Sequence, residues 1–186
     1  MTGSPYPTIS LPKLTLIIGG ARSGKSRLAE RLVSACGCPR TYIATAQGWD
    51  DEMRARIARH LTDRGDGWQT IEAPLDLPQV LQDVSADRVV LLDCATLWLS
   101  NQMLAEAEVT AKIAELLLAL AECAAPVVVV SNEVGWSIVP DNALARAFRD
   151  HQGRLNQQLA AQAGMVVAVM AGLPIALKGT LPEGVA

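Results

Sequence analysis

Residues 19–26 read GGARSGKS, and this stretch decides the fold of the 186-residue chain. It matches the phosphate-binding pattern GxxxxGK followed by Ser or Thr, and it stands between an apolar run at residues 14–18 and a helical pattern that begins at Lys25. A strand, a glycine-rich loop and a helix are the context that this pattern requires. The glycines let the backbone turn its N–H groups toward phosphate oxygens. We therefore predict a P-loop that binds a nucleoside triphosphate.

Two side chains of this motif have predicted chemical roles. Lys25 can reach the β and γ oxygens of a triphosphate, so we assign it a catalytic role in stabilising the transferred group. The hydroxyl of Ser26 can ligate Mg²⁺. The predicted nucleotide-binding residues of the motif are Gly19, Gly20, Ala21, Arg22, Ser23, Gly24, Lys25 and Ser26.

Short β-branched runs alternate with helical patterns along the rest of the chain. The runs lie at residues 13–18, 40–44, 88–93, 126–131 and 165–170, and the helical patterns at 25–36, 51–64, 104–123 and 142–162. Such alternation indicates an α/β fold, a single P-loop NTPase domain with a mainly parallel central sheet flanked by helices. Residues 68–72 add a possible short strand, and the prolines after it indicate connections. We expect a flexible N-terminal extension at residues 1–12, the domain at 13–179 and a C-terminal tail at 180–186.

Composition limits the class of protein. The net charge of −3 argues against a broad nucleic-acid surface, and residues 116–130, the most apolar stretch, are too short to span a membrane. The N-terminus lacks the pattern of a signal peptide, and the four cysteines lack the paired spacing of a zinc site. We expect reduced thiols and a cytoplasmic location.

Asp93 and Glu133 follow two of the apolar runs. Asp93 ends VVLLD, where a carboxylate would emerge beside the P-loop and hold Mg²⁺ directly or through water. An acidic residue at such a place can also cap the next helix. Glu133 follows residues 127–130 and has the same two interpretations, a functional carboxylate or a loop cap.

Histidine occurs twice in the chain. His60 lies in DDEMRARIARHLTDR, where helical spacing brings it near Met53 and Ile57. Neutral imidazole can attack phosphorus without prior deprotonation, but a partly buried packing histidine explains the spacing equally well. His151 lies in a helical stripe of apolar side chains, which favours a structural role. The arginines of that helix, Arg146, Arg149 and Arg154, form an ordinary charged face or bind phosphate.

Six motifs occur together in one order: GGARSGKS, YIATA, DDEMRARIARH, DCATLWLSN, SNEVGWSIVP and GRLNQQLA. In this combination the chain resembles the bifunctional adenosylcobinamide kinase and adenosylcobinamide-phosphate guanylyltransferase family of cobalamin biosynthesis. The resemblance extends from about residue 14 to residue 178. It is far more specific than the P-loop alone.

The resemblance implies two reactions and a covalent intermediate. The first reaction phosphorylates the aminopropanol hydroxyl of adenosylcobinamide, and the second transfers GMP from GTP to that phosphate with release of pyrophosphate. His60 matches the histidine that carries GMP. Mg²⁺ is the implied cofactor, and GTP is the implied triphosphate, with ATP as the alternative for the kinase step. The implied assembly is a homo-oligomer, and the family suggests a homotrimer.

The same resemblance adds residues to the nucleotide site. Their ordinary alternatives are a tight strand exit for the alanines around Thr45 and a solvated strand residue for Glu72. The added residues are Ala44, Thr45, Ala46, Leu61, Thr62, Asp63, Arg64, Glu72 and Asp93. His151 stands where relatives can carry an aliphatic side chain, which weakens a catalytic role for it.

Two other functions share part of this pattern. A simple small-molecule kinase would use the same P-loop with a structural His60, and a covalent adduct with GTP separates the two. A nucleotide-dependent switch fits poorly, because SNEVG stands in place of an NKxD guanine signature. For oligomer contacts, the apolar patterns at residues 104–123 and 144–159 are candidates, although such stripes also form monomer cores.

Overall fold

One seven-stranded sheet runs through the chain, in the order β3-β2-β4-β5-β1-β6-β7. The computed structural model describes residues 9–47 and 66–184. All strand pairs are parallel except β6 with β7, which are antiparallel. The strands are β1 (Leu14–Gly19), β2 (Arg40–Ala44), β3 (Trp68–Glu72), β4 (Val89–Asp93), β5 (Val127–Asn132), β6 (Met165–Met170) and β7 (Leu173–Lys178). The predicted α/β class with a mainly parallel sheet is confirmed.

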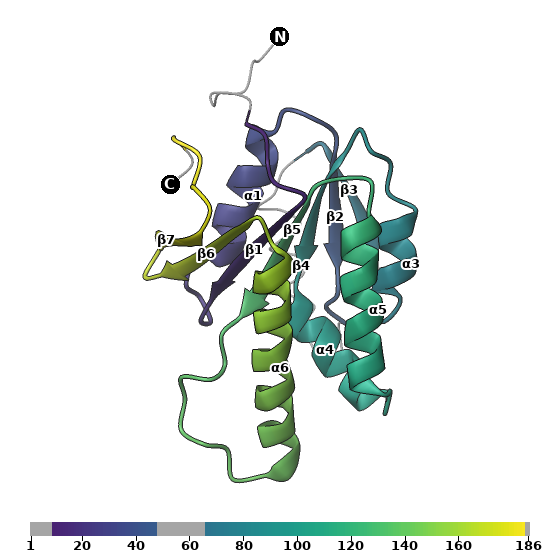
Figure 1. Cartoon of the computed structure of the whole chain (residues 1–186), viewed down its shortest axis with the longest axis vertical. Helices are drawn as coiled ribbons and strands as arrows, with labels where there is room; N and C mark the ends of the chain where they lie inside the picture. The colour runs from purple at the N-terminus through teal and green to yellow at the C-terminus, as the bar shows by residue number, and fades with distance from the viewer. Residues whose placement is uncertain (1–8, 48–65, 185–186) are drawn as a thin grey trace.

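Helices cover both faces of this sheet (Figure 1). They are α1 (Lys25–Ala35), α3 (Leu77–Gln82), α4 (Ala95–Leu104), α5 (Val109–Glu122) and α6 (Ala143–Gln162). Side chains of β1 point alternately to the two faces, so Leu16 packs in the cluster with α3 to α6 while Ile17 packs in the cluster with α1. Burial on both faces explains why the central strands are almost continuously apolar.

The predicted elements agree with the structure to within a residue for most strands, and β2 and β6 have the predicted bounds. The helix predicted over residues 104–123 is wrong at its start. Leu104 ends α4, and Glu106 has a positive φ of 55°, which interrupts a helical backbone. The next helix, α5, begins at Val109, with the Glu108 carboxylate accepting from the Thr110 amide. The helix predicted at residues 51–64 lies outside the described residues.

Three elements have no counterpart among the sequence predictions: α3, α4 and β7. Pro78 was read as a connection, but it lies in the first turn of α3, where a missing N–H costs nothing. Buried residues occur around most of α4, so it has no single apolar stripe. Pro174 lies in β7, an edge strand that tolerates proline.

Both predicted terminal segments contain residues that touch the domain. Within the predicted N-terminal extension, Leu11 is buried and the Ile9 amide donates to the Ala35 carbonyl at 3.0 Å. Leu181 of the predicted tail packs against the same cluster as Leu11. Residues 9–12 and Leu181 therefore continue the packed domain.

Two further observations concern composition. Among the described residues, no helix combines the length and the apolar character needed to cross a membrane. All four cysteines, Cys36, Cys38, Cys94 and Cys123, are free thiols, as expected from the sequence.

Candidate nucleotide site

The GGARSGKS loop joins β1 to α1 and is held by hydrogen bonds from three directions. The Glu133 amide, at the end of β5, donates to the Gly19 carbonyl at 3.1 Å. The Ser23 amide donates to Gly20 within the loop, and the Gly172 amide from the β6–β7 turn donates to the Ser23 carbonyl at 2.9 Å. The loop shape is therefore fixed by both strands that flank β1 and by its own turn.

Glycine is required at both ends of the loop, for different reasons. A Cβ on Gly19 would lie 2.6 Å from the Ser23 hydroxyl and from the Val169 carbonyl oxygen, closer than packed atoms approach. Gly24 has a φ of 95°, in the left-handed region that favours glycine. Arg22 also has a positive φ of 58°. Such turns orient successive N–H groups toward one anion.

Lys25 and two serines complete the loop. The Lys25 side chain is only 7% exposed, and its Nζ donates to the Gly20 carbonyl at 3.1 Å, so the ammonium group is folded back over the loop. The Ser23 hydroxyl is buried and has no hydrogen-bond partner among the described residues. Ser26 is half-buried in the first turn of α1. The arrangement concentrates one positive charge and several donors at the start of a helix.

Asp93 ends β4 at the same carboxyl edge, but β5 separates β4 from β1. The sequence predicted that this carboxylate would emerge beside the P-loop. In the structure the strand that bears it is one strand further away. The next residue, Cys94, is buried. Burial and, secondarily, the negative charge of Asp93 raise the pKa of the Cys94 thiol to about 12, although the positive charge of Lys25 acts in the opposite direction. Cys94 thus remains a neutral thiol.

Thr45 and Ala46 follow β2 at this edge, and Glu72 ends the neighbouring β3. Thr45 is fully buried and hydrogen-bonded to Cys94, whereas Ala44 and Ala46 are half-buried. Glu72 is exposed and lies beside Ala44 in the sheet register. The structure therefore brings these residues to the edge that carries Asp93, with Glu72 on its outer strand.

A buried polar cluster that the sequence analysis did not identify lies behind the end of β5. The Ser131 hydroxyl donates to Asn156 Oδ1 at 2.6 Å, and Gln152 Nε2 donates to Ser131 Oγ at 2.8 Å. Thr96 Oγ1, in α4, accepts from the Asn132 amide at 2.7 Å. The signal for it was present in α6, where polar Gln152 and Asn156 occupy positions i and i+4 among buried leucines.

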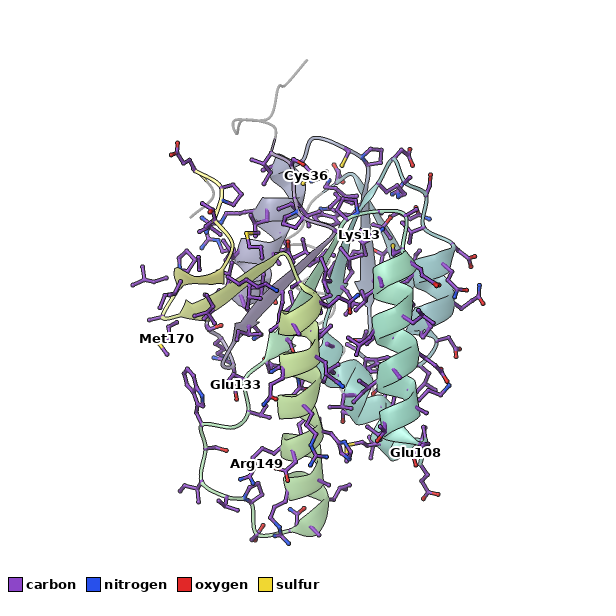
Figure 2. All side chains as sticks on the ribbon, viewed as in Figure 1. Lys13, Cys36, Glu108, Glu133, Arg149 and Met170 are labelled. Atoms are coloured by element: carbon purple, nitrogen blue, oxygen red, sulfur yellow. The ribbon has the colours of Figure 1, made fainter. Side chains whose placement is uncertain are left out.

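Several candidates prove to have local structural contacts. Glu133 lies where β5 passes into the connection to α6 (Figure 2), and its carboxylate accepts from the Gly135 amide at 2.7 Å, which is a loop cap. Arg146 donates to the carbonyls of Pro140 and Asp141, and Arg149 lies 3.4 Å from the Asp150 carboxylate. His151 is half-buried on α6.

The predicted nucleophile and its neighbours lie outside the part of the chain that the structure describes. These residues are His60, Leu61, Thr62, Asp63 and Arg64. The described chain stops at Gln47, three residues after β2, and resumes at Asp66, two residues before β3.

The donor atoms at this edge suit a Mg²⁺ ion that binds together with a nucleotide. Ser26 supplies a hydroxyl and Asp93 a carboxylate, both hard oxygen ligands. Within residues 9–47 and 66–184, no group of three His, Cys, Asp or Glu residues could hold an ion. Mg²⁺ in P-loop sites keeps phosphate oxygens and water among its ligands, so a sparse protein donor set is consistent with it.

Two solved structures have a similar fold. The RadB recombinase superposes with a TM-score of 0.55 over 94% of this chain and 85% of that chain, at 16% identity. The flagellar accessory protein FlaH from Methanocaldococcus jannaschii gives a TM-score of 0.51 over 93% of this chain and 84% of its own, at 15% identity. At these identities the similarities show a shared α/β fold.

Sequence comparison identifies much closer relatives. The chain is 45% identical to the bifunctional adenosylcobalamin biosynthesis protein CobP of Pseudomonas aeruginosa, over 88% of this chain and 96% of that protein. It is 41% identical to the bifunctional adenosylcobalamin biosynthesis protein CobU of Escherichia coli K12, over 89% of this chain and 99% of that protein. A family model described as cobinamide kinase / cobinamide phosphate guanyltransferase matches residues 15–177. The chain therefore belongs to the cobinamide kinase / cobinamide phosphate guanyltransferase family.

Proposed function

We propose that this protein is a bifunctional enzyme of cobalamin biosynthesis. It phosphorylates adenosylcobinamide, and it then transfers GMP from GTP to adenosylcobinamide phosphate, giving adenosylcobinamide-GDP and pyrophosphate. The observation that carries the proposal is the intact GGARSGKS loop, with the buried Lys25 ammonium folded over it, in a chain whose family match extends over residues 15–177.

In the kinase step, the chain's own residues bind and neutralise the triphosphate. The loop amides and Lys25 contact the β and γ phosphates and stabilise the charge that develops as the γ-phosphoryl group moves. The hydroxyl of Ser26 and the carboxylate of Asp93 would hold a Mg²⁺ ion, which would offset the negative charge of the phosphates.

In the guanylyl step, His60 divides the transfer into two displacements. Its neutral imidazole nitrogen attacks the α-phosphorus of GTP, an N–P bond forms, and the bond to pyrophosphate breaks. The N–H proton of the other ring nitrogen passes to solvent as the adduct forms, and the imidazole takes up a proton from solvent when the N–P bond later breaks. A phosphate oxygen of adenosylcobinamide phosphate then attacks the same phosphorus, the N–P bond breaks, and the free histidine is restored.

Several finer features belong to the proposal. GTP serves the guanylyl step, and GTP or ATP serves the kinase step. Leu61, Thr62, Asp63, Arg64, Ala44, Ala46 and Glu72 complete the nucleotide site, and Thr45 lies between two of them without contacting the nucleotide. We also place the enzyme in the cytoplasm, where nucleoside triphosphates are available and thiols remain reduced.

A homotrimer is the proposed assembly. The apolar residues Ile113 and Leu116 of α5 and Leu155 and Leu159 of α6 are buried in the monomer core, whereas Leu104 and Leu118 are exposed. Further large apolar side chains are exposed on the β5–α6 connection, in the first turn of α6 and on β7. They are Trp136, Ile138, Val139, Leu144, Leu173, Ile175 and Leu177. Exposed apolar residues of this kind favour contact with another subunit.

The decisive experiment is incubation with Mg²⁺ and GTP labelled at the α-phosphorus, followed by mapping of the labelled peptide. The proposal expects an acid-labile adduct on His60 that is discharged by adenosylcobinamide phosphate. A chain that phosphorylates adenosylcobinamide but never acquires the label would instead be a simple kinase.

A further inference from the structure

We propose that Thr45 is a positioning residue for the Mg²⁺–nucleotide site: its hydroxyl fixes the backbone at Asp93 and Cys94 and so sets the direction of the Asp93 carboxylate. This inference rests on the proposed role of Asp93 as a metal ligand. It gives Thr45 a different task from that of a residue that touches the nucleotide.

Thr45 binds the chain around Asp93 at three atoms. Its amide donates to the Asp93 carbonyl oxygen at 3.3 Å. Its hydroxyl accepts from the Cys94 amide at 2.8 Å and donates to the Cys94 carbonyl oxygen, also at 2.8 Å. Both polar ends of the Asp93–Cys94 peptide unit, together with the next carbonyl, are therefore held by one residue.

The hydroxyl of Thr45 has no capacity left for a phosphate. A threonine hydroxyl has one hydrogen to donate, and that hydrogen is used by Cys94. The side chain is 0% exposed. A direct contact with nucleotide would require breaking a buried hydrogen bond, so the geometry favours an indirect role.

Thr45 is itself held in place from α4. Asn101 Nδ2 donates to the Thr45 carbonyl at 2.9 Å and to the Pro74 carbonyl at 3.0 Å, so it ties the segment after β2 to the segment after β3. The Cys94 carbonyl also accepts from the Trp98 amide in the first turn of α4. The segment that bears Asp93 is thus held by α4, the helix that follows it, both directly and through Thr45.

Within the described chain, one other buried threonine, Thr15, lacks such a hydrogen bond. Thr15, in β1, is equally buried, yet its hydroxyl has no partner among the described residues. Thr15 is the second residue of β1, so it lies away from the carboxyl edge of the sheet. Thr15→Val is therefore a matched control for the loss of a buried threonine hydroxyl.

The test measures how strongly Mg²⁺ improves nucleotide binding. The probe is α,β-methylene GTP, in which carbon replaces the oxygen that would leave the α-phosphorus, so no adduct forms. Calorimetric titrations with Mg²⁺ and with EDTA give two dissociation constants, and their ratio is the Mg²⁺ enhancement. For Thr45→Val we expect the enhancement to fall about tenfold, with the constant in EDTA unchanged, because misdirecting Asp93 removes metal-dependent binding alone.

Three comparisons make the outcome specific. Thr45→Ser, which keeps the hydroxyl, and Thr15→Val should both retain the parent enhancement. In Asn101→Ala, which acts through Thr45, the Mg²⁺ enhancement should fall about threefold. This variant serves as the test if Thr45→Val does not fold. A parent-like enhancement in Thr45→Val, or an equal loss of affinity with Mg²⁺ and with EDTA, would overturn the positioning role.

Asp93→Asn separates this inference from the proposal on which it rests. If Asp93→Asn loses the enhancement while Thr45→Val keeps it, Asp93 is a ligand and Thr45 does not position it. If Asp93→Asn keeps the enhancement, the metal role of Asp93 is wrong and the positioning role fails with it.

Discussion

The Lys25 ammonium lies 3.1 Å from the Gly20 carbonyl oxygen, folded over the loop that it follows. A phosphate bound in the loop would therefore find the positive charge of Lys25 already in position. We expect Lys25→Ala to lower both the kinase and the guanylyl rates by at least about 100-fold, since a preorganised charge is removed from the transition state. Steady-state assays of each reaction measure the effect.

Lys178→Ala is the matched control for this change. Lys178 pairs with Val166 near the amino end of β6, whereas the P-loop lies at the carboxyl ends of the strands. The Lys178 ammonium donates to the carbonyls of Ala160 and Ala161. Its replacement should leave both rates near those of the parent. Equal rates for Lys25→Ala and the parent would remove Lys25 from the mechanism.

Asp93→Asn tests the second predicted charge. The amide keeps the size of the side chain but loses the carboxylate charge that Mg²⁺ prefers. The Mg²⁺ concentration for half-maximal turnover should therefore rise about tenfold. Asp83→Asn, at an exposed carboxylate beyond α3, is the control. An unchanged Mg²⁺ titration would leave Asp93 as a structural residue.

His60→Ala should abolish the covalent adduct and guanylyl transfer while kinase activity persists, because only the second reaction needs the imidazole nucleophile. Labelling with α-labelled GTP and a separate kinase assay, run beside His151→Ala, give the two readouts. If His60 only packs, both activities and the thermal midpoint should fall together, as they do when a core residue is lost. A label that maps to His151 would contradict the assignment.

Cys36 should react slowly with alkylating reagents. Burial, with a smaller contribution from the charge of Cys38, raises the pKa of the Cys36 thiol from 9.0 to about 11. At pH 8 this lowers the thiolate fraction about 100-fold, and the greater nucleophilicity of a more basic thiolate returns about tenfold, so labelling should be about tenfold slower than for an ordinary thiol.

The raised pKa of Cys36 also makes the stability of the protein depend on pH. Because folding favours the protonated thiol, the contribution of Cys36 to the free energy of unfolding is complete below pH 9 and is lost as the pH rises to about 11. Mass-spectrometric labelling of Cys36 across this range, with Cys36→Ser as the blank, measures the midpoint. A midpoint near pH 9 would contradict the burial effect.

Ile138→Asp should weaken the oligomer. This side chain is 93% exposed on the β5–α6 connection, and a charge there would have to be desolvated on association. Sedimentation velocity should show smaller species for Ile138→Asp, whereas Leu118→Asp, which changes an exposed apolar side chain on α5, should behave as the parent. Unchanged sedimentation of Ile138→Asp would move the interface elsewhere.

The sequence predicted the strands well because those strands are buried on both faces. β2 and β6 are short β-branched runs with polar or glycine boundaries, and no helical period competes with that pattern. It failed for α4, because Trp98, Asn101 and Gln102 are all buried and the helix has no polar face to mark its period. Propensity alone cannot locate a helix that is surrounded by protein.

Only the part of the candidate site that lies within one local motif could be predicted from the sequence. GGARSGKS specifies its own turn, its glycines and Lys25, and all of them lie where the motif requires. The place of Asp93 depends on sheet order, and the insertion of β5 between β4 and β1 cannot be inferred from VVLLD. The bonds from Thr45 to Cys94 join residues that follow two different strands, so no local pattern reveals them.

The order of the strands also determines when the phosphate-binding loop can exist during synthesis. β1 is made first, but its two neighbours are β5 and β6, so Leu14 finds its partner Val127 and Thr15 finds Met165 only after most of the chain has emerged. The amides that hold Gly19 and Ser23 come from Glu133 and Gly172. Contacts this distant along the chain form late in folding. A nascent chain that has not yet reached β5 therefore has the P-loop sequence without the P-loop, and nucleotide binding reports that β1 has paired with β5 and β6.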